Sequence, residues 1–266
     1  MFGAGYLAAV AWGAWSKQSA GSACGETVAV PGKARAAKPT FRVALFNMRS
    51  GFRADFSRNL EAVRKGLEGF DVIALNEVAF DWGDRTDQAH VLSEELGLAA
   101  LFAPTERLWG REHFGNALLT AVPIRRWCRL PLGGTSTHAY RNMTLAQIDL
   151  DGLSVQVLVT HVDVDVDADR LGQLRQVATL FHSLKAPCLV MGDFNSWRGD
   201  PAVAALFEGP GVQIVEPPFQ ASQVPKRCDW IVARGLTRVA SSITELNVSD
   251  HPLVWAEFET PKPAGP

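Results

Sequence analysis

Several features that would point to other classes of protein are missing from this 266-residue sequence. It contains no Cys-x-x-Cys pair, so its cysteines do not form the usual zinc or redox motif. It has no glycine-rich dinucleotide-binding fingerprint, and nothing else in it suggests an organic cofactor. Its formal net charge is only −2, so no overall basic field draws it to nucleic acid or to an anionic membrane. A local basic patch is still compatible with this composition.

Long apolar runs are also scarce. The N-terminal stretch from Phe2 to Trp15 is apolar, but it is shorter than the roughly 18 residues of a membrane-spanning helix. It lacks the basic residues that normally precede a signal-peptide core, and Gly21-Ser22-Ala23-Cys24 only faintly resembles a lipoprotein cleavage site. Residues 1–24 leave two alternatives open: a cytoplasmic protein with an apolar leader or extra helix, or an exported or membrane-anchored protein.

The rest of the sequence has the composition of a folded domain. It is 47% hydrophobic and 20% charged, which is enough apolar material for a sizeable core. Residues 25–40 are rich in Pro, Gly and Ala, as linkers are. We therefore predict an apolar N-terminal segment plus linker over residues 1–40, one domain over 41–260 and a Pro-rich tail over 261–266. Nothing implies a protein partner, and we expect a monomer.

Strand and helix patterns alternate along this domain, and a strand–helix–strand unit is predicted in each half. The first unit comprises residues 41–46, 56–67 and 71–75, and the second comprises residues 153–159, 171–181 and 188–191. Each unit should connect two parallel strands. Further β-rich stretches follow Asn116, Asn142, Asp229 and Pro252. This pattern predicts an α/β sandwich of two sheets with helices outside.

Polar side chains stand where the predicted strands end. They are Asn47, Glu77, His161, Asp193 and Asn195, joined by Asp229 at the start of one strand and by Asp250 and His251 just before the last. In α/β sheets, ligands collect beyond the carboxyl ends of the parallel strands. We therefore predict that these side chains meet in one site.

The residue types suit metal-assisted hydrolysis of a phosphate ester. Glu77, Asn47 and Asp250 offer oxygen atoms, which suit Mg²⁺ or Mn²⁺. Asp193 can accept a proton from an attacking water, and Asn195 can orient that water or a phosphate oxygen.

The two histidines suit the charge that develops on phosphorus. His161 and His251 can donate hydrogen bonds to phosphoryl oxygens. Asp229 can orient the ring of His251 and stabilise its charged form, as the acid of a catalytic triad does.

Six segments occur in the order found in a known superfamily. They are Phe46-Asn47-Met48, Asn76-Glu77-Val78, Thr160-His161, Gly192-Asp193-Phe194-Asn195, Asp229-Trp230-Ile231 and Ser249-Asp250-His251-Pro252. The segment from Gly115 to Ile124 is similar to another recurrent segment of that superfamily. From Phe41 to about Phe258 the chain resembles the endonuclease/exonuclease/phosphatase superfamily, which includes deoxyribonucleases, apurinic endonucleases and sphingomyelinases.

The resemblance implies a four-layer α/β/β/α sandwich of two mixed sheets with outer helices. It implies metal binding by Glu77 with Asn47 beside it, and by Asp250 as a second acid on the metal or phosphate side. It also implies activation of water by Asp193 next to Asn195.

The remaining implied roles concern the substrate phosphate. His251, paired with Asp229, and His161 would face the phosphate. Arg141 and Asn116 would contact it in a looser alignment.

The sequence departs from the family pattern at two places. Asn76 stands where a Gln usually precedes the metal-binding Glu. Asp163, Asp165 and Asp167 form an acidic run after His161. We interpret this run as a solvated turn and helix-start cap rather than a second cation site. Its charge would repel a long polyanion unless a cation were bound there.

These observations predict a divalent-metal-dependent phosphodiester hydrolase with nucleic acid as the leading substrate. The alternatives are a phospholipid phosphodiesterase, a phosphomonoesterase and, in another class, a catalytically inactive binding protein on the same fold. Arginines in candidate rim loops would suit nucleic acid, whereas exposed aromatics such as Trp82 and Trp109 would suit a lipid. Trp197 could stack on a substrate.

We interpret Cys188 and Cys228, near the predicted site, as small buried residues. Whether these two cysteines form a disulfide is left open.

Overall fold

The computed structural model describes residues 17–31, 35–49, 56–81, 86–134, 139–215 and 228–260. Three subjects of the sequence predictions lie outside these ranges: the first 16 residues of the apolar N-terminal segment, Trp82, and the tail 261–266. Among the described residues, no helix combines the length and the apolarity needed to span a bilayer.

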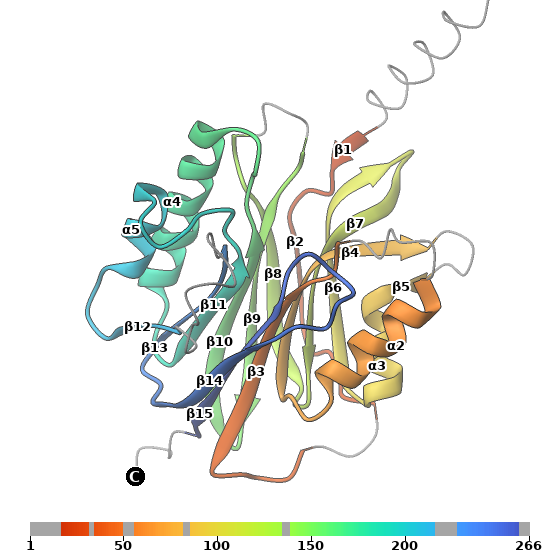
Figure 1. Ribbon diagram of the computed structural model, residues 1–266, viewed down its shortest axis with the longest axis vertical. Helices are drawn as coiled ribbons and strands as arrows, with labels where there is room; N and C mark the ends of the chain where they lie inside the picture. The colour runs from red at the N-terminus through yellow and green to blue at the C-terminus, as the bar shows by residue number, and fades with distance from the viewer. Residues whose placement is uncertain are drawn as a thin grey trace, which may run out of the picture.

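Two mixed β-sheets pack face to face and form the body of the molecule (Figure 1). The first sheet has the order β1 (Lys17–Ser19), β6 (Ala99–Leu108), β7 (Arg111–Thr120), β4 (Val72–Asp81), β3 (Thr40–Asn47), β15 (Leu253–Glu259) and β14 (Arg238–Thr244), and β5 (Thr86–Asp87) pairs with β4. The second sheet has the order β12 (Val212–Ile214), β13 (Asp229–Arg234), β11 (Cys188–Asp193), β10 (Leu153–His161), β9 (Asn142–Leu150), β8 (Ile124–Pro131) and β2 (Ala23–Gly25).

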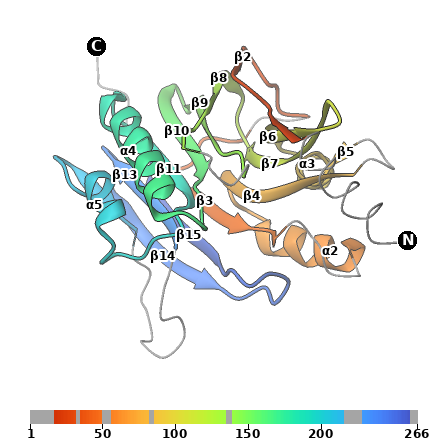
Figure 2. The same ribbon diagram turned by 90° about the horizontal axis from the view of Figure 1, so that it is seen from above.

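Helices cover the outer surface of each sheet (Figure 2). They are α2 (Phe56–Leu67) and α3 (Gln88–Leu96) on the first sheet, and α4 (Asp167–Ser183) and α5 (Pro201–Phe207) on the second. The strands alternate accordingly: Val43 and Leu45 of β3 point into the core between the sheets, whereas Ala44 and Phe46 point toward the helices. The predicted four-layer α/β/β/α sandwich is confirmed.

Both predicted strand–helix–strand units are present with parallel strands. β3 pairs with β4 and β10 pairs with β11, each in parallel. The registers place Asn47 opposite Asn76 and His161 opposite Asp193. The carboxyl ends of β3, β10 and β11 therefore carry Asn47, His161 and Asp193, which the sequence predicted to meet.

The residues predicted to precede the domain instead contribute to both sheets. β1 pairs with β6, β2 pairs with β8, and Cys24 forms a disulfide with Cys128. Among the described residues, backbone pairing with the sheets therefore extends N-terminal to the predicted domain start at Phe41, as far as Lys17. These strands are only three residues long, too short for a hydrophobic period to reveal them. Cys188 and Cys228 are free.

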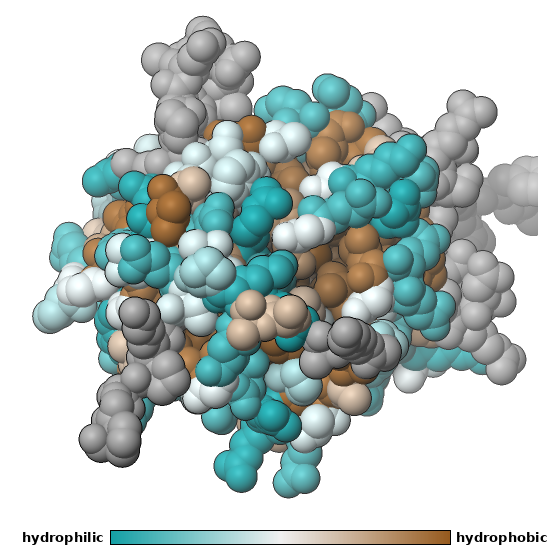
Figure 3. All heavy atoms as spheres, turned by 90° about the horizontal axis from the view of Figure 1, so that it is seen from below, coloured by the Kyte–Doolittle hydropathy of each residue, from teal (hydrophilic) through white to brown (hydrophobic). Residues whose placement is uncertain are grey.

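The predicted linker also ties the sheets together at the end opposite the predicted site. The Arg35 guanidinium contacts Asp71, at the start of β4, at 2.7 Å, and Asp151, in the turn between β9 and β10, at 2.8 Å. Figure 3 shows the molecule from below, the side on which β3 begins, with hydrophilic and hydrophobic areas interspersed. Leu67 and Phe70 line a pocket at this end, and the Arg35–Asp71 ion pair forms part of its wall.

Gly192 lets β10 and β11 approach closely beside the site. A Cβ atom at this position would lie 1.9 Å from the backbone oxygen of Thr160, which cannot move without displacing β10. Any larger residue must therefore separate the two strands that carry His161 and Asp193.

We expect Gly192→Ala to lower the free energy of unfolding by about 1–3 kcal/mol, the usual range for overpacking a well-packed core. Gly172→Ala is the matched control, because Gly172 lies within α4 and a Cβ there meets nothing within 4 Å. Alanine should stabilise that helix by roughly 0.5–1 kcal/mol. Urea unfolding of both variants tests this, and equal stabilities would contradict the close approach.

Candidate active site

Glu77 lies at a β-bulge within β4, not at the strand end that the sequence suggested. Leu75 pairs with Ala117 and Val78 pairs with Gly115, so two residues of β4 oppose Asn116 alone. Glu77 has a φ of 55°, which is unusual for a side chain of its size. The bulge turns consecutive side chains in different directions. Asn76 is buried between the sheets, while the half-buried Glu77 contacts Asn47 at the site.

Asn47 connects the acid of the first sheet to the acid of the second. Its amide nitrogen donates to Glu77 Oε1 at 3.1 Å and to Asp193 Oδ2 at 3.0 Å, while its Oδ1 accepts from the backbone N of Arg49. Within the described part of the chain, the Glu77 carboxylate makes no other hydrogen bond. Its remaining lone pairs are available to a hard cation, and the donor set of carboxylate and amide oxygens suits Mg²⁺ or Mn²⁺.

A chain of buried amides supports this arrangement. Asn76 donates to Asn116 Oδ1 at 2.8 Å and to the backbone oxygen of Thr160 at 3.0 Å, and Asn116 donates to Asn142 Oδ1 at 3.2 Å. Asn76 Oδ1 in turn accepts from the backbone N of Asp193 at 2.9 Å. The bulge of β4 thereby fixes the position of Asp193 on the opposite sheet.

Asp193 is a buried, ionised carboxylate. Burial would raise its pKa, but the neighbouring rings of His161 and His251 and the hydrogen bonds from Asn195 N and Asn47 outweigh burial and lower the pKa. Asn195 itself has a φ of 45°, in the left-handed region that Asn tolerates. Asn195 Nδ2 donates to the backbone oxygen of Val162 at 3.0 Å, so its orientation is fixed.

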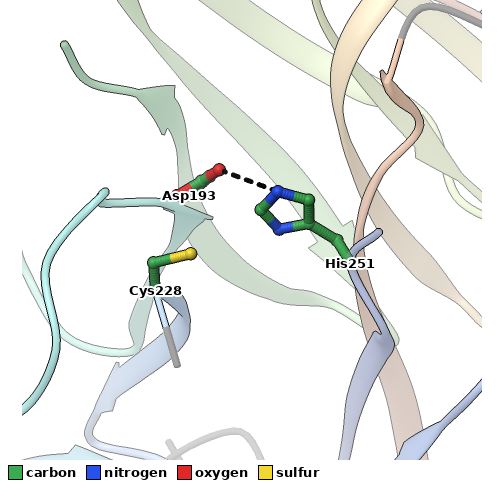
Figure 4. A group of neighbouring side chains, drawn as sticks. All are labelled: Asp193, Cys228 and His251. Atoms are coloured by element: carbon green, nitrogen blue, oxygen red, sulfur yellow. Dashed lines mark ion pairs between the residues drawn. The ribbon is translucent and has the colours of Figure 1, made fainter. Parts of the chain in front are cut away.

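His251 is held as a cation by two acids. Its Nδ1 lies 2.8 Å from Asp229 Oδ2, and its Nε2 lies 3.7 Å from Asp193 Oδ2 (Figure 4). Burial alone would lower the pKa of His251. The hydrogen bond that His251 donates to Asp229 and the charges of Asp229, Asp193 and Asp250 outweigh that effect and raise the pKa to about 9. The ring is therefore protonated at neutral pH, and Nε2 presents a proton to the site.

His161 is neutral by contrast. Burial, followed by the charge of Arg141, lowers the pKa of His161 to about 3. Arg141 lies 3.1 Å from His161 Nδ1, and Asn195 Nδ2 lies 3.2 Å from His161 Nε2, so both ring nitrogens face a hydrogen-bond donor and a positive charge on the ring is disfavoured. His161 Nε2 is also 3.7 Å from Asp193 Oδ2. The two histidines thus face one carboxylate with different charges.

Asp250, Arg141 and Asn116, which were predicted to contact metal or phosphate, bind other protein groups in this structure. Asp250 is about half exposed and pairs with Arg49 at 3.0 Å. The hydrogen bonds and ion pairs of the described residues do not join Asp250 to Glu77 or Asn47. Arg141 is buried behind His161, and Asn116 is only 1% exposed within the amide chain.

The acidic run after His161 is solvated at Asp165 and Asp167, as predicted, but not at Asp163. Asp163 is fully buried, and its Oδ1 accepts from the backbone N atoms of Asp165 and Val166 just before α4. Asp167 is exposed and pairs with Arg170 in the first turn of that helix. Asp163 therefore shapes the entry to α4, and its charge is not displayed to solvent.

The sequence predictions missed the site contributions of Arg49 and Cys228. Arg49 follows the Asn47 segment directly, and Cys228 immediately precedes Asp229, so adjacency to predicted site residues was the available signal. The Cys228 thiol contacts the Asp193 carboxylate, and burial followed by the charges of Asp193 and Asp229 raises the thiol pKa. Trp109 and Trp197, predicted as candidate substrate-stacking residues, are 52% and 43% exposed.

Comparison with known proteins agrees with this geometry. The sequence profile described as "Endonuclease/Exonuclease/phosphatase family" matches residues 44–251. A search of curated protein sequences finds no match.

Several solved structures share the fold. An endonuclease/exonuclease/phosphatase family protein from Bacteroides thetaiotaomicron is 14% identical, with a TM-score of 0.68 over 82% of this chain and 97% of that one. TDP2 from D. rerio, complexed with a single-strand DNA product, is 16% identical, with a TM-score of 0.67 over 84% and 100%. A mannosyl-6-phosphatase from Bacteroides thetaiotaomicron is 14% identical, with a TM-score of 0.66 over 83% and 100%. At these identities the likeness shows the fold.

The pairing of His251 with Asp229 predicts a measurable titration. Because the folded-state pKa of about 9 lies above the ordinary 6.5, the charged pair stabilises the protein fully below pH 6.5. This contribution is lost as the pH rises through about 9. In Asp229→Asn, burial is less strongly opposed, and we expect the pKa of His251 to fall toward 6.5 or lower in an NMR titration. His90, which pairs with Asp87 at 2.6 Å, is the internal control. An unchanged His251 titration would contradict this assignment.

Proposed function

Because the chain belongs to the endonuclease/exonuclease/phosphatase family, we propose that it hydrolyses phosphate esters with the help of a divalent metal ion. One observation carries this proposal: a single hydrogen-bond network joins Glu77, Asn47 and Asp193, with His251 beside it. These residues come from both sheets and from four separate segments of the chain. A catalytically inactive binding protein would not require such convergence of acid, amide and imidazolium groups.

Glu77 would hold the metal, with the oxygen of Asn47 as a neighbouring ligand after exchange of its bond to Arg49. When bound, Mg²⁺ or Mn²⁺ supplies Lewis-acid neutralisation of the charge on phosphate and leaving oxygens. A site with one carboxylate suits Mg²⁺, which retains several waters and combines one or two carboxylates with substrate phosphate. Asp250 could add a second acid only after releasing Arg49.

Asp193 would hold the attacking water. Its lowered pKa keeps it ionised at neutral pH, so it is a weak base whose main contribution is to accept the water's hydrogen bond in a fixed direction. Asn195, anchored to Val162, would place its amide beside that water or beside a phosphate oxygen. Both acceptor and amide are fixed before substrate arrives, which lowers the entropic cost of alignment.

The two histidines would serve the developing negative charge in different ways. Protonated His251 donates a charge-assisted hydrogen bond from Nε2 to a phosphoryl oxygen, while Asp229 holds its ring. Neutral His161 adds no second positive charge beside Asp193, and its ring is held between Arg141 at Nδ1 and Asn195 at Nε2. Arg141 thus becomes a positioning residue in this proposal, and so does Asn116 through Asn76.

A phosphodiester is the substrate class we propose, with nucleic acid as the leading candidate. The similarity to TDP2, which has been captured with a single-strand DNA product, supports this choice. The burial of Asp163 also removes part of the acidic surface that would repel a polyanion. Phospholipid and phosphomonoester substrates are the alternatives, and a panel of plasmid DNA, sphingomyelin, p-nitrophenyl phosphate and bis-p-nitrophenyl phosphate distinguishes them.

We expect Asp193→Ala to reduce Mg²⁺-dependent turnover of the preferred panel substrate by about 10²–10⁴-fold, the usual contribution of a positioned acid–base group. Asp149→Ala is the control, because the described partners of Asp149 are the exposed Arg125 and the backbone N of Gly152. Circular dichroism should show both variants folded. Near-normal turnover by folded Asp193→Ala would end the proposal.

Glu77→Gln keeps the size of the side chain and removes one negative charge from the proposed metal site. We expect the Mg²⁺ concentration for half-maximal activity to rise at least tenfold, with partial rescue at high Mg²⁺. Glu61→Gln, which changes an exposed acid on α2, should leave this concentration unchanged. If the two variants respond identically to Mg²⁺, Glu77 does not hold the metal.

A further inference from the structure

We propose that Cys228, His251 and Asp193 form a second metal site, selective for a soft or borderline ion such as Zn²⁺, and that occupation of this site inhibits hydrolysis. The three side chains offer one sulfur, one nitrogen and one oxygen atom, all within 4.8 Å of one another. Figure 4 shows the three side chains converging from separate segments of the chain. The proposed inhibition rests on the proposed function, whereas the binding itself does not.

The spacing needs little adjustment to enclose an ion. His251 Nε2 and Asp193 Oδ2 are 3.7 Å apart. In a tetrahedral zinc site with bonds of roughly 2.0–2.2 Å to nitrogen and oxygen, these atoms lie roughly 3.4 Å apart. The Cys228 thiol already contacts the Asp193 carboxylate, so a small rotation brings the third ligand into range. The fourth position would take water or a phosphate oxygen.

The donor set differs in kind from that of the Glu77 site. Thiolate and imidazole ligands favour Zn²⁺ and related ions, whereas carboxylate and amide oxygens favour Mg²⁺. Asp229 also holds His251 through Nδ1, which leaves Nε2 as the ligand atom, in the acid–histidine–metal arrangement common around zinc. When Mg²⁺ is the only divalent ion present, it would therefore occupy the Glu77 site, and the site at Cys228 would stay empty.

Access to the site is partial. Cys228 is neither fully buried nor exposed, and the His251 side chain is 20% exposed. Binding requires that the thiol proton and the Nε2 proton of His251 leave to solvent, so the ion replaces two protons. Asp193 is already ionised and contributes its carboxylate directly.

Hydrolysis would be inhibited because the ion would bind the same His251 and Asp193 atoms that the proposed reaction needs. His251 Nε2 would lose the proton that it donates to the phosphoryl oxygen, and Asp193 would no longer be free to accept a hydrogen bond from water. Both catalytic contributions would be lost without any change at Glu77. Cys228 would thus make the enzyme sensitive to a cation that is not its cofactor.

Cobalt spectroscopy tests the binding without any turnover. The full chain is titrated with Co²⁺, and we expect a sulfur-to-cobalt charge-transfer band that Zn²⁺ abolishes by competition. Cys228→Ser should lose this band and weaken Zn²⁺ binding roughly 100-fold or more, since even an outer partner of a zinc ligand contributes 10–100-fold. Cys188→Ala is the matched control, because Cys188 is the other free cysteine. It lies at the first residue of β11, whereas Asp193 is the last.

The second measurement is Zn²⁺ inhibition at saturating Mg²⁺. Wild type and Cys188→Ala should be inhibited by low Zn²⁺, whereas Cys228→Ser should need roughly 100-fold more, with inhibition expressed relative to each variant's own turnover in Mg²⁺ alone. No cobalt band in the wild type, or a band that persists in Cys228→Ser, overturns the metal site. Cys228-dependent binding without inhibition overturns its control of hydrolysis. If the wild type hydrolyses no substrate, the proposed function fails, while the cobalt titration still decides whether the site exists.

Discussion

The site depends on hydrogen bonds that cross from one β-sheet to the other. Asn47 and Asn76, both from the first sheet, bind the side chain and the backbone of Asp193 on the second. Both amides are fully buried, and an unpaired buried amide costs about 1–3 kcal/mol. Any sliding of the sheets would break these bonds together. The network therefore fixes the distance between Glu77 and Asp193, on which the proposed chemistry depends.

This rigid frame places the Asp193 carboxylate between two histidines that differ in protonation state. The Asp229 carboxylate contacts the His251 ring on the side away from Asp193, and His251 stays protonated. The Arg141 guanidinium contacts the His161 ring, and His161 stays neutral. Two imidazolium groups facing Asp193 would repel each other, and two neutral rings would leave no cation for the phosphate. The partners behind the rings, Asp229 and Arg141, are therefore as important to the electrostatics as the rings themselves.

Much of this arrangement could be predicted from the sequence, because it depends on local patterns. The predicted helix over residues 56–67 is α2, and the strand-end positions of Asn47, His161 and Asp193 follow from apolar runs that stop at a polar residue. The bulge at Glu77 could not be predicted, since it depends on pairing with β7, a partner distant in sequence. Burial of Asp163, the Arg49–Asp250 pair and the Cys24–Cys128 disulfide likewise depend on tertiary contacts.

The bulge also explains how Asn76 can stand where the family usually has a longer Gln. An extra residue in β4 turns Asn76 into the space between the sheets, where its short side chain reaches Thr160, Asn116 and the backbone of Asp193. A longer amide would have to fold back or push β11 away, and Gly192 shows that β10 and β11 already meet closely there. The shorter residue and the close strand approach are therefore two parts of one packing solution. This solution keeps Glu77 at the site and lets the Asn76 amide position the backbone of Asp193.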